Sequence, residues 1–390
     1  MAIRERFRNG KSEGWVVYYR DGTGTRRNKI FRKKREAQTY LAETVIAVRG
    51  GIHTPESTSI TVAQAAELWL ERGRTEKLEQ STLRQYAGHV GLHIVPNLGS
   101  TKLARLTAPM VEAFKDKLLR ETSRPMARKV LTTLKSILRD ALRRGLVAQN
   151  AALGVKVETK KRARAKLAVG RDIPSKEEIT AIFEAARGRW RPLIITAALT
   201  GLRASELRGL CWDSVDFERR VIHVRQRADL WRTLGAPKSA AGDREVPMSR
   251  TVVNVLREWK LACPPGELNL AFPTGAGTVE SHANICNRGW YPAQIDAGVT
   301  YEGGAKYGLH GLRHFYASWA IEQGFSPKRV QALLGHSSIQ MTFDVYGHLF
   351  PSLEDDHAKF DAAETVLLET ASKWQPNGPL VPFNLAFLIG

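Results

Sequence analysis

The chain has 390 residues, of which 43% are hydrophobic, and its 59 Lys and Arg residues outnumber its 39 Asp and Glu residues. This length predicts two or three domains, each able to bury its own core. The formal charge of +20 favours a polyanionic partner, although a ribosomal or membrane-surface protein would also fit the charge alone. No segment reaches the roughly 18–20 apolar residues of a membrane helix, and the charged start lacks the apolar run of a signal peptide. We therefore expect an intracellular protein with no membrane partner.

The three cysteines, Cys211, Cys263 and Cys286, are odd in number, far apart and never arranged as Cys-x-x-Cys. This pattern is typical of reduced thiols in the cytosol. We expect neither a disulfide framework nor a cysteine-based zinc site.

The first 57 residues hold 13 Lys and Arg against 6 Asp and Glu. Their pattern predicts a strand over 15–20, a turn over 21–24, a returning strand over 26–31 and a helix over 34–48. A small basic sheet with one helix could lie in a DNA groove, or it could be a solvated surface. The candidate DNA-binding residues here are Arg26, Arg27 and Lys29.

A linker rich in Gly, Ser and Thr follows, and Thr61 then caps a predicted helix. Further helices are expected over 80–93, 107–121 and 125–144, giving an all-helical domain over 60–155. The last helix alternates an apolar stripe with cations, and Asp140 is its one acidic residue. These cations could form a solvated face, but the scarcity of carboxylates favours phosphate contacts.

Residues 156–172 are interpreted as a basic interdomain linker. From Lys160 to Arg171 there are six cations and no carboxylate, a composition suited to a strap along a phosphate backbone. A disordered, solubilising linker is the alternative. The candidate DNA-binding residues of this segment are Lys160, Lys161, Arg162 and Arg164.

A third domain is expected over 173–371, beginning at a capping box formed by Ser175 and Glu178. Helices are predicted to about residue 210, then a hairpin within 215–224, then helices again to about residue 371. Residues 372–390 form a tail with a strongly apolar end, which we expect to pack on its own domain or on a neighbouring protomer.

Five short segments of this third domain each offer a group that could act on a phosphodiester. In chain order they are Thr-Gly-Leu-Arg-Ala-Ser-Glu-Leu at 200–207, Pro237-Lys238, His-Gly-Leu-Arg at 310–313, Leu-Gly-His at 334–336, and Tyr346. In-line attack builds negative charge on the non-bridging oxygens and on the leaving 5′ oxygen. A protein without a metal must meet this charge with cations and hydrogen-bond donors. Together the segments predict DNA strand cleavage by a tyrosine nucleophile.

Arg203 and Arg313 suit the non-bridging oxygens, because a planar guanidinium donates two hydrogen bonds at once and stays charged. Glu206, one helical turn after Arg203, is expected to hold that guanidinium in place. The alternative for Arg203 is an ordinary surface arginine.

The remaining polar groups are assigned by their local context. Lys238, on a turn-rich loop, is the candidate general acid for the leaving oxygen, with Lys306 as its nearest competitor. His310 shares a helix opening with Arg313, and His336 lies at a helix junction where a neutral imidazole could donate to the phosphate.

A zinc site is the competing interpretation of the histidines. His310 and His314 are four residues apart, which is the spacing of a zinc-binding helix. The glutamate that should follow the first histidine is missing, and no third ligand is apparent. We therefore predict no metal and no cofactor.

The nucleophile must be chosen among four tyrosines, Tyr301, Tyr307, Tyr316 and Tyr346. Tyr316 belongs to a helix that reads as buried, whereas Tyr346 ends a helix ten residues after His336. A phenol has a pKa of about 10, so it needs nearby cations to become a competent nucleophile. Tyr346 is our choice.

These five segments resemble the tyrosine recombinases of the phage integrase family, and the resemblance extends over essentially the whole chain. The correspondences are the first arginine motif at 200–207, the β-hairpin lysine at Lys238, the His-x-x-Arg box at 310–313, the Leu-Gly-His box at 334–336 and the nucleophile at Tyr346. Gly311 departs from the pattern, since relatives often have aspartate there, and so does the 44-residue tail after Tyr346.

The resemblance implies a multidomain fold. Its expected parts are a small α+β amino-terminal arm-binding domain over 1–57, an all-α core-binding domain over 60–155, and a mainly α catalytic domain with a small β-sheet over 173–371.

The same resemblance implies a site-specific recombinase that integrates or excises a phage or mobile element through a 3′-phosphotyrosyl intermediate. It would act in the bacterial cytoplasm, at the nucleoid, as a homotetramer on double-stranded attachment sites. A DNA-bending host factor and an excisionase would be further partners. The alternatives are a relaxing topoisomerase of similar chemistry and a non-catalytic DNA-binding regulator.

Overall fold

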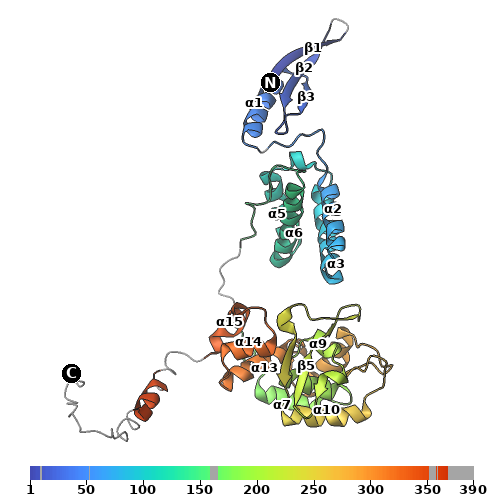
Figure 1. Cartoon of the computed structure of the whole chain (residues 1–390), viewed down its shortest axis with the longest axis vertical. Helices are drawn as coiled ribbons and strands as arrows, with labels where there is room; N and C mark the ends of the chain where they lie inside the picture. Colours follow the sequence, from blue (N-terminus) through green and yellow to red (C-terminus); the bar gives the residue numbers. More distant parts are fainter. Residues whose placement is uncertain (9–10, 52, 159–165, 351–356, 358, 368–390) are drawn as a thin grey trace, which may run out of the picture. The chain divides into compact units, whose positions relative to one another are not determined.

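The computed structural model describes residues 1–8, 11–51, 53–158, 166–350, 357 and 359–367. Contacts divide the chain into two compact units, Met1–Arg162 and Ala163–Gly390, and each is described here by itself. Figure 1 shows the strands and helices of both units.

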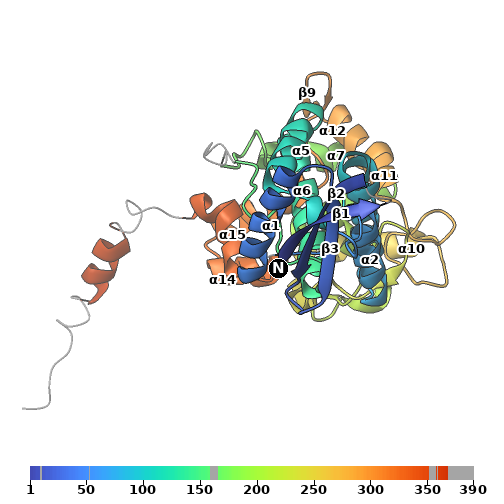
Figure 2. The same cartoon turned by 90° about the horizontal axis from the view of Figure 1, so that it is seen from above.

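The first unit begins with an antiparallel sheet of three strands in the order β1-β2-β3, followed by α1. Their bounds are β1 Ala2–Arg8, β2 Lys11–Arg20, β3 Arg26–Phe31 and α1 Lys34–Arg49. Alternate residues of a strand face opposite sides of a sheet, so Val17 and Tyr19 lie together and pack with Ala37 of α1. Figure 2 shows the sheet and α1 from above.

The two strands and the helix predicted for this region are confirmed, but β1 was not predicted. Its sequence, Ala-Ile-Arg-Glu-Arg-Phe-Arg, has too few apolar residues to be identified as a strand by itself. Pairing with β2 supplies what its own residues lack: Ile3 lies opposite the buried Val17, and Glu5 lies opposite Trp15.

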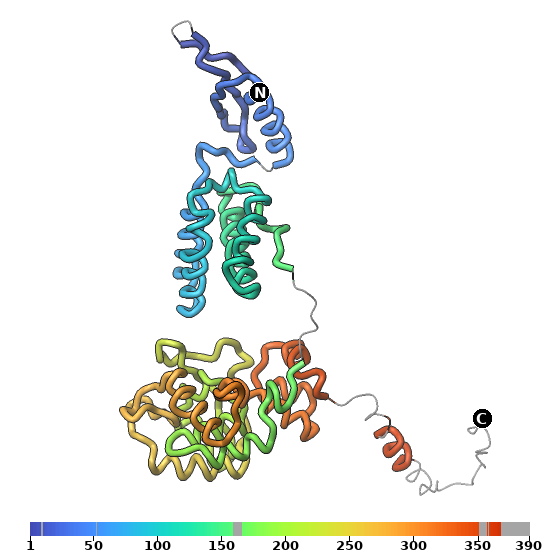
Figure 3. Tube along the Cα trace, turned by 180° about the vertical axis from the view of Figure 1, so that it is seen from behind, coloured from blue at the N-terminus to red at the C-terminus, as the bar shows by residue number. Residues whose placement is uncertain are grey.

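The rest of the first unit is helical, as predicted. The helices are α2 Val62–Thr75, α3 Gln80–His89, α4 Val95–Leu98, α5 Ala108–Glu121 and α6 Arg124–Arg143, with a π-helical turn at Val90–Ile94. Thr61 and Gln64 form a reciprocal capping box at the start of α2. Helix α6 contacts α2, α3 and α5 and buries its predicted apolar stripe among them. Figure 3 shows the trace of the chain through this helical region.

The second unit is mainly helical with small sheets. Its helices are α7 Lys176–Ala185, α8 Trp190–Thr200, α9 Ala204–Arg208, α10 Arg250–Ala262, α11 His282–Asn284, α12 Tyr291–Asp296, α13 Gly311–Glu322, α14 Pro327–Leu334 and α15 Ile339–Tyr346. The three-stranded antiparallel sheet β4-β5-β8 comprises Val215–Asp216, Val221–Val224 and Arg244–Pro247. Two hairpins accompany it, β6 Arg227–Ala228 with β7 Leu234–Gly235, and β9 Thr300–Tyr301 with β10 Gly304–Ala305. The capping box of Ser175 and Glu178 is present at α7, as predicted.

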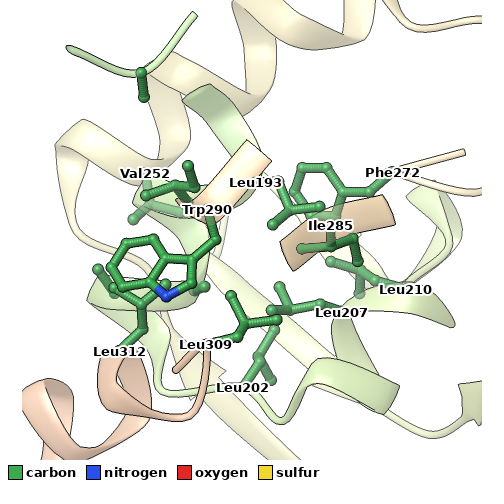
Figure 4. Packing of buried hydrophobic residues seen from close by; sticks show 14 of the residues in the cluster. Leu193, Leu202, Leu207, Leu210, Val252, Phe272, Ile285, Trp290, Leu309 and Leu312 are labelled. Carbon is green, nitrogen blue, oxygen red and sulfur yellow. The ribbon is translucent and has the colours of Figure 1, made fainter. Parts of the chain in front are cut away.

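The hydrophobic core of this unit surrounds the fully buried Trp290, whose indole N–H donates to the carbonyl of Tyr307 over 2.8 Å (Figure 4). The same core includes Leu202 and Leu207, which bracket the predicted residues of α9, and Leu309 and Leu312, which bracket the start of α13. Apolar anchors on both sides therefore fix the backbone that bears the polar groups.

A second cluster in this unit joins α13, α14 and α15 and includes Tyr316, Leu334 and Tyr346. Gly201 ends α8 in the left-handed region, with φ of 63°, and a Cβ there would lie 2.4 Å from the Tyr316 ring. Only glycine fits this close approach, which brings the turn after α8 against α13.

Three further predictions concern the cysteines, membrane-spanning helices and the carboxyl-terminal residues. All three cysteines are free thiols, as predicted, and burial raises the pKa of each. No helix within the described ranges is long and apolar enough to cross a membrane. Of the helices predicted to continue to about residue 371, residues 359–367 are helical and exposed, and the tail over 372–390 lies outside the described residues.

Candidate active site

Glu206 is the central carboxylate of the candidate site and is only 3% exposed. It accepts hydrogen bonds from Arg203 Nη1 at 2.7 Å and from Arg244 Nη2 at 2.9 Å, and the Arg203 amide also donates to it. Burial alone would raise the pKa of Glu206, but these two arginines lower it below the ordinary value. Glu206 is therefore a charged anchor that fixes both guanidiniums.

Arg313 is the most buried cation of the site, with 3% of its surface exposed. Its Nη1 donates to the Gly201 carbonyl at 2.8 Å and its Nη2 to the Leu334 carbonyl at 2.6 Å. Burial and the charge of Arg203 lower the pKa of Arg313 to about 9, which still leaves it charged at neutral pH. Its hydrogen bonds go to backbone dipoles, so its positive charge is held in place without being neutralised.

Arg203 connects these groups. Its Nη2 donates to the Gly335 carbonyl at 2.8 Å, directly after the Leu334 carbonyl that Arg313 uses. Gly335 ends α14 in the left-handed region, with φ of 63°, so the chain turns sharply there and presents successive carbonyls to the two arginines.

His336 follows this turn and is buried. Its Nδ1 lies 2.9 Å from Thr342 Oγ1, and its ring is parallel to the Tyr346 ring with centroids 6.5 Å apart. Burial and the charges of Arg313 and Arg203 lower the pKa of His336 to about 4. The imidazole is therefore neutral at pH 7, as the sequence analysis expected.

Tyr346 is the last residue of α15 and only 2% exposed. Burial raises the pKa of its phenol to about 12, and the charge of Arg313 opposes that rise. Its Oη lies 2.8 Å from His314 Nδ1. The structure thus holds a protonated, inward-facing phenol beside the arginine cluster.

His310 precedes α13, and its ring meets the His314 ring edge-on with centroids 4.7 Å apart. His310 is exposed. Its pKa is nevertheless lowered, first by desolvation and then by the charges of His314, Arg313 and Arg203. Within the described residues no group of three or more His, Cys, Asp or Glu side chains could hold a metal ion.

The two candidate lysines differ in their surroundings. Lys238 is exposed and lies in the segment between β7 and β8. Lys306 forms an ion pair with Glu178 at 2.7 Å, and this hydrogen bond raises the pKa of the lysine. The ammonium of Lys306 is therefore committed to a structural contact.

Two site residues were missed by the sequence analysis. Arg244 was not considered, although it lies two residues before the buried Val246 on β8 and hence on the same face of that strand. His314 was weighed only as a zinc ligand. Its position beside Arg313 in the sequence was the available signal.

The candidate DNA-binding residues of the first unit are not equivalent. Arg27 pairs with Asp21 at 2.9 Å and Lys29 with Glu56 at 2.7 Å, whereas Arg26 is exposed. Lys160, Lys161, Arg162 and Arg164 lie outside the described residues.

Some cations on and near α6 likewise have a carboxylate partner. Asp140 is buried and accepts hydrogen bonds from Arg72, Arg143 and Arg144 at 2.5, 3.2 and 2.7 Å. Part of the basic face expected to meet phosphate is thus neutralised internally.

Two protein-family models match this chain. Residues 175–352 match the model of the phage integrase family, and residues 62–157 match that of the phage integrase central domain. The chain belongs to the phage integrase family of tyrosine recombinases. It is an integrase-type enzyme of site-specific DNA recombination, and its multidomain fold agrees with the prediction.

Curated relatives share this chemistry. A XerC-like tyrosine recombinase of Caldanaerobacter subterraneus is 27% identical over 90% of this chain and 94% of its own length. An integrase of Streptomyces ambofaciens is 26% identical over 86% of this chain and 89% of its own. The prophage integrase IntR of Escherichia coli is 27% identical over 58% of each chain.

Solved structures show the same fold at lower identity. The Tn1549 transposon integrase in complex with a circular intermediate DNA is 18% identical with a TM-score of 0.63, covering 78% of this chain and 100% of that one. A lambda integrase tetramer bound to a Holliday junction is 20% identical with a TM-score of 0.56, covering 86% of this chain and 95% of that one.

Proposed function

We propose that Tyr346 is the nucleophile of this recombinase. Its Oη attacks the scissile phosphorus, forming a 3′-phosphotyrosyl bond and breaking the bond to the 5′ oxygen, which leaves as a hydroxyl. A 5′ hydroxyl from the partner duplex reverses the step, so the energy of the broken bond is retained and no ATP is needed. The supporting observation is the buried, un-neutralised Arg313, whose charge already acts on the Tyr346 phenol.

Arg203 and Arg313 are proposed to bind the two non-bridging oxygens of the transition state. Both are pre-positioned by backbone carbonyls, and Arg203 also by Glu206, so little reorganisation is needed when charge develops. Arg244 is added as a supporting residue, because it shares Glu206 with Arg203. His310 and His336, neutral in the free protein, are proposed to donate to the phosphate.

Lys238 is proposed as the general acid that protonates the leaving 5′ oxygen. Its exposed position on the segment after β7 leaves it accessible to DNA, whereas the competing Lys306 is held by Glu178. A lysine provides a proton for the leaving oxygen without a metal.

The domain organisation is proposed as in the sequence analysis, with an arm-type domain over 1–57, a core-binding domain over 60–155, a linker over 156–172, a catalytic domain over 173–371 and a tail over 372–390. The division between the compact units falls within the proposed linker, and the two family matches fall on either side of it.

The sheet face opposite α1 is proposed to contact arm-type DNA. Side chains of directly paired residues share a face, so Arg20 and Arg26 lie together there, as do Arg4 and Val16. Arg27 and Lys29 are paired with Tyr19 and Val17, so they lie on the face toward α1, and each already has a carboxylate partner. This makes Arg26 the strongest of the three.

A homotetramer on paired attachment sites is the proposed assembly, since a lambda integrase of the same fold is a tetramer on a Holliday junction. A bending host factor and an excisionase are proposed as further partners. The enzyme would act at the nucleoid in the bacterial cytoplasm. Integration or excision of a phage or another mobile element is the proposed outcome.

The decisive experiment uses a nicked suicide substrate that traps the covalent intermediate. Tyr346→Phe should bind attachment-site DNA like the wild type and form no phosphotyrosyl adduct, while Tyr301→Phe, an exposed tyrosine of β9, should react normally. An adduct with Tyr346→Phe would refute the assignment. Rapid relaxation of plasmids lacking an attachment site, without strand exchange, would instead favour the topoisomerase alternative.

A further inference from the structure

The hydrogen bond of the Tyr346 phenol leads to a residue outside the five motifs. Tyr346 Oη and His314 Nδ1 are 2.8 Å apart, and the two rings are inclined at 62°. His314 lies on the first turns of α13, directly after Arg313. The helix that supplies a phosphate-binding arginine thus also supplies the contact to the proposed nucleophile.

The protonation states determine the direction of this bond. Burial lowers the pKa of His314 first, and Arg313 lowers it further, while Asp172 opposes both. Burial raises the pKa of Tyr346 to about 12. The phenol is therefore protonated and the imidazole neutral, so Tyr346 Oη donates and His314 Nδ1 accepts.

The other two histidines are less suited to accept this proton. His336 uses its Nδ1 for Thr342 Oγ1, and its ring lies parallel to the Tyr346 ring at 6.5 Å. His310 meets the ring of His314 rather than the phenol. Around His314 the charged and titratable groups are Arg313, His310, Tyr346 and Asp172.

We propose that His314 is the general base that removes the proton from Tyr346 Oη during attack, a role that rests on Tyr346 being the nucleophile. The O–H bond of the phenol breaks as the O–P bond forms, and the proton moves to His314 Nδ1. Lys238 gives a separate proton to the leaving 5′ oxygen. When the strand is rejoined, the His314 imidazolium returns its proton to the departing phenolate.

The carboxylate of Asp172 makes this step favourable. It is charged, because hydrogen bonds from Arg171 and from the Ala168 amide lower its pKa, and its charge favours protonated His314. Arg313 acts in the opposite direction on His314, but bound phosphate offsets the charge of that arginine. The base is therefore weak in the free protein and stronger once DNA is bound.

The test separates activation of the nucleophile from protonation of the leaving group. Single-turnover cleavage is measured on matched suicide substrates with either oxygen or sulfur at the 5′ bridging position, since a thiolate leaves without a proton. His314→Gln and His314→Asn are compared with Lys238→Ala and with the control His223→Gln, which lies on β5. Thermal unfolding and DNA binding are measured for every variant.

The expected result is that sulfur restores cleavage by Lys238→Ala but leaves both His314 variants slower by about 100-fold, the lower range of general-base effects. The wild-type rate should rise with pH and level off once His314 is neutral. With His314→Gln the rate should instead keep rising log-linearly into the alkaline range, because solvent must then remove the proton.

Three outcomes would overturn the inference: wild-type rates for both folded His314 variants, rescue of these variants by sulfur, or a slowed rate with an unchanged pH profile, which would indicate positioning alone. Failure of the underlying assignment would look different. In that case Tyr346→Phe would still form an adduct, whatever the His314 variants do.

Discussion

Each unit of this protein contains a nearly fully buried carboxylate surrounded by arginines, Asp140 in the first and Glu206 in the second. The arginines around Asp140 keep much of their surface in water, up to 57% for Arg143. Around Glu206, the Arg244 side chain keeps only 6% of its surface exposed, although Arg203 keeps 34%. The motif is thus hydrated at every arginine in one unit and dry at Arg244 in the other.

The two clusters differ most in that the second contains a buried cation, Arg313, that bonds to no carboxylate. All three arginines at Asp140 bond to that carboxylate, and Arg72 links α2 to α6 through it. In the second unit Arg313 bonds to backbone carbonyls, so one buried positive charge is left for an incoming anion. A shared carboxylate indicates a structural cluster, whereas an arginine held only by carbonyls indicates an anion site.

The largest difference between the clusters should appear in catalysis. Arg313→Ala should slow single-turnover cleavage by roughly 100- to 1000-fold, about 3–4 kcal/mol of barrier, as for a lost oxyanion donor. The matched change Arg144→Ala should leave cleavage per bound complex unchanged. If Arg313→Ala abolished DNA binding but cleaved normally once bound, the transition-state role would be wrong.

Glu206→Gln should destabilise the second unit by about 3 kcal/mol, because the buried Arg244 would lose the carboxylate that compensates its charge. Denaturant unfolding of the full chain, followed by the fluorescence of buried tryptophans such as Trp290, measures this loss. Equal stability of variant and wild type would show that the dry cluster does not depend on its carboxylate.

Asp140→Asn should cost less, about 1 kcal/mol, because its exposed arginines can return to water when the carboxylate is removed. The same unfolding experiment applies, now read on the first unit through Trp69. A cost as large as that of Glu206→Gln would remove the distinction between a hydrated and a dry cluster.

The smallest effect concerns acid stability of the dry cluster. The pKa of His336 is lowered to about 4, while in the unfolded chain it is about 6.5. As pH falls from 6.5 to 4, His336 is protonated in the unfolded state but not in the folded state. The free energy of unfolding therefore decreases over this pH range. From pH 7 to 5.5 the wild type should lose up to about 1 kcal/mol more than His336→Asn. Parallel stability curves for the two proteins would contradict this.

Sequence reasoning could predict those contacts of the candidate site that join residues close together in the chain. Glu206 could be assigned to Arg203 because the two are one helical turn apart, and the ion pair is present at 2.7 Å. Arg244 could not be assigned in that way, since its link to Glu206 spans 38 residues and depends on how β8 packs. The same reason explains His314, whose partner Tyr346 is 32 residues away.

The amino-terminal region shows the same limit. The helix and two strands were predicted because their apolar periodicity is local, whereas β1 depends on pairing with β2. From composition alone, Arg26, Arg27 and Lys29 were equivalent candidates for DNA binding. Only the fold shows that Lys29 meets Glu56, 27 residues later, while Arg26 has no ion pair among the described residues. Net charge predicts the kind of partner but not which cations are available to it.

One contact in the second unit connects the segment just after Tyr346, the proposed nucleophile, to the linker. His348, two residues after Tyr346, lies with its Nε2 2.8 Å from the carbonyl of Leu167, in the described part of the proposed linker 156–172. Leu167 also packs against the cluster that contains Tyr346. A displacement of the linker on DNA binding would therefore be transmitted to Tyr346, the proposed nucleophile, through one hydrogen bond and one apolar contact. Tension in the linker and the timing of DNA cleavage would thus be coupled through Leu167.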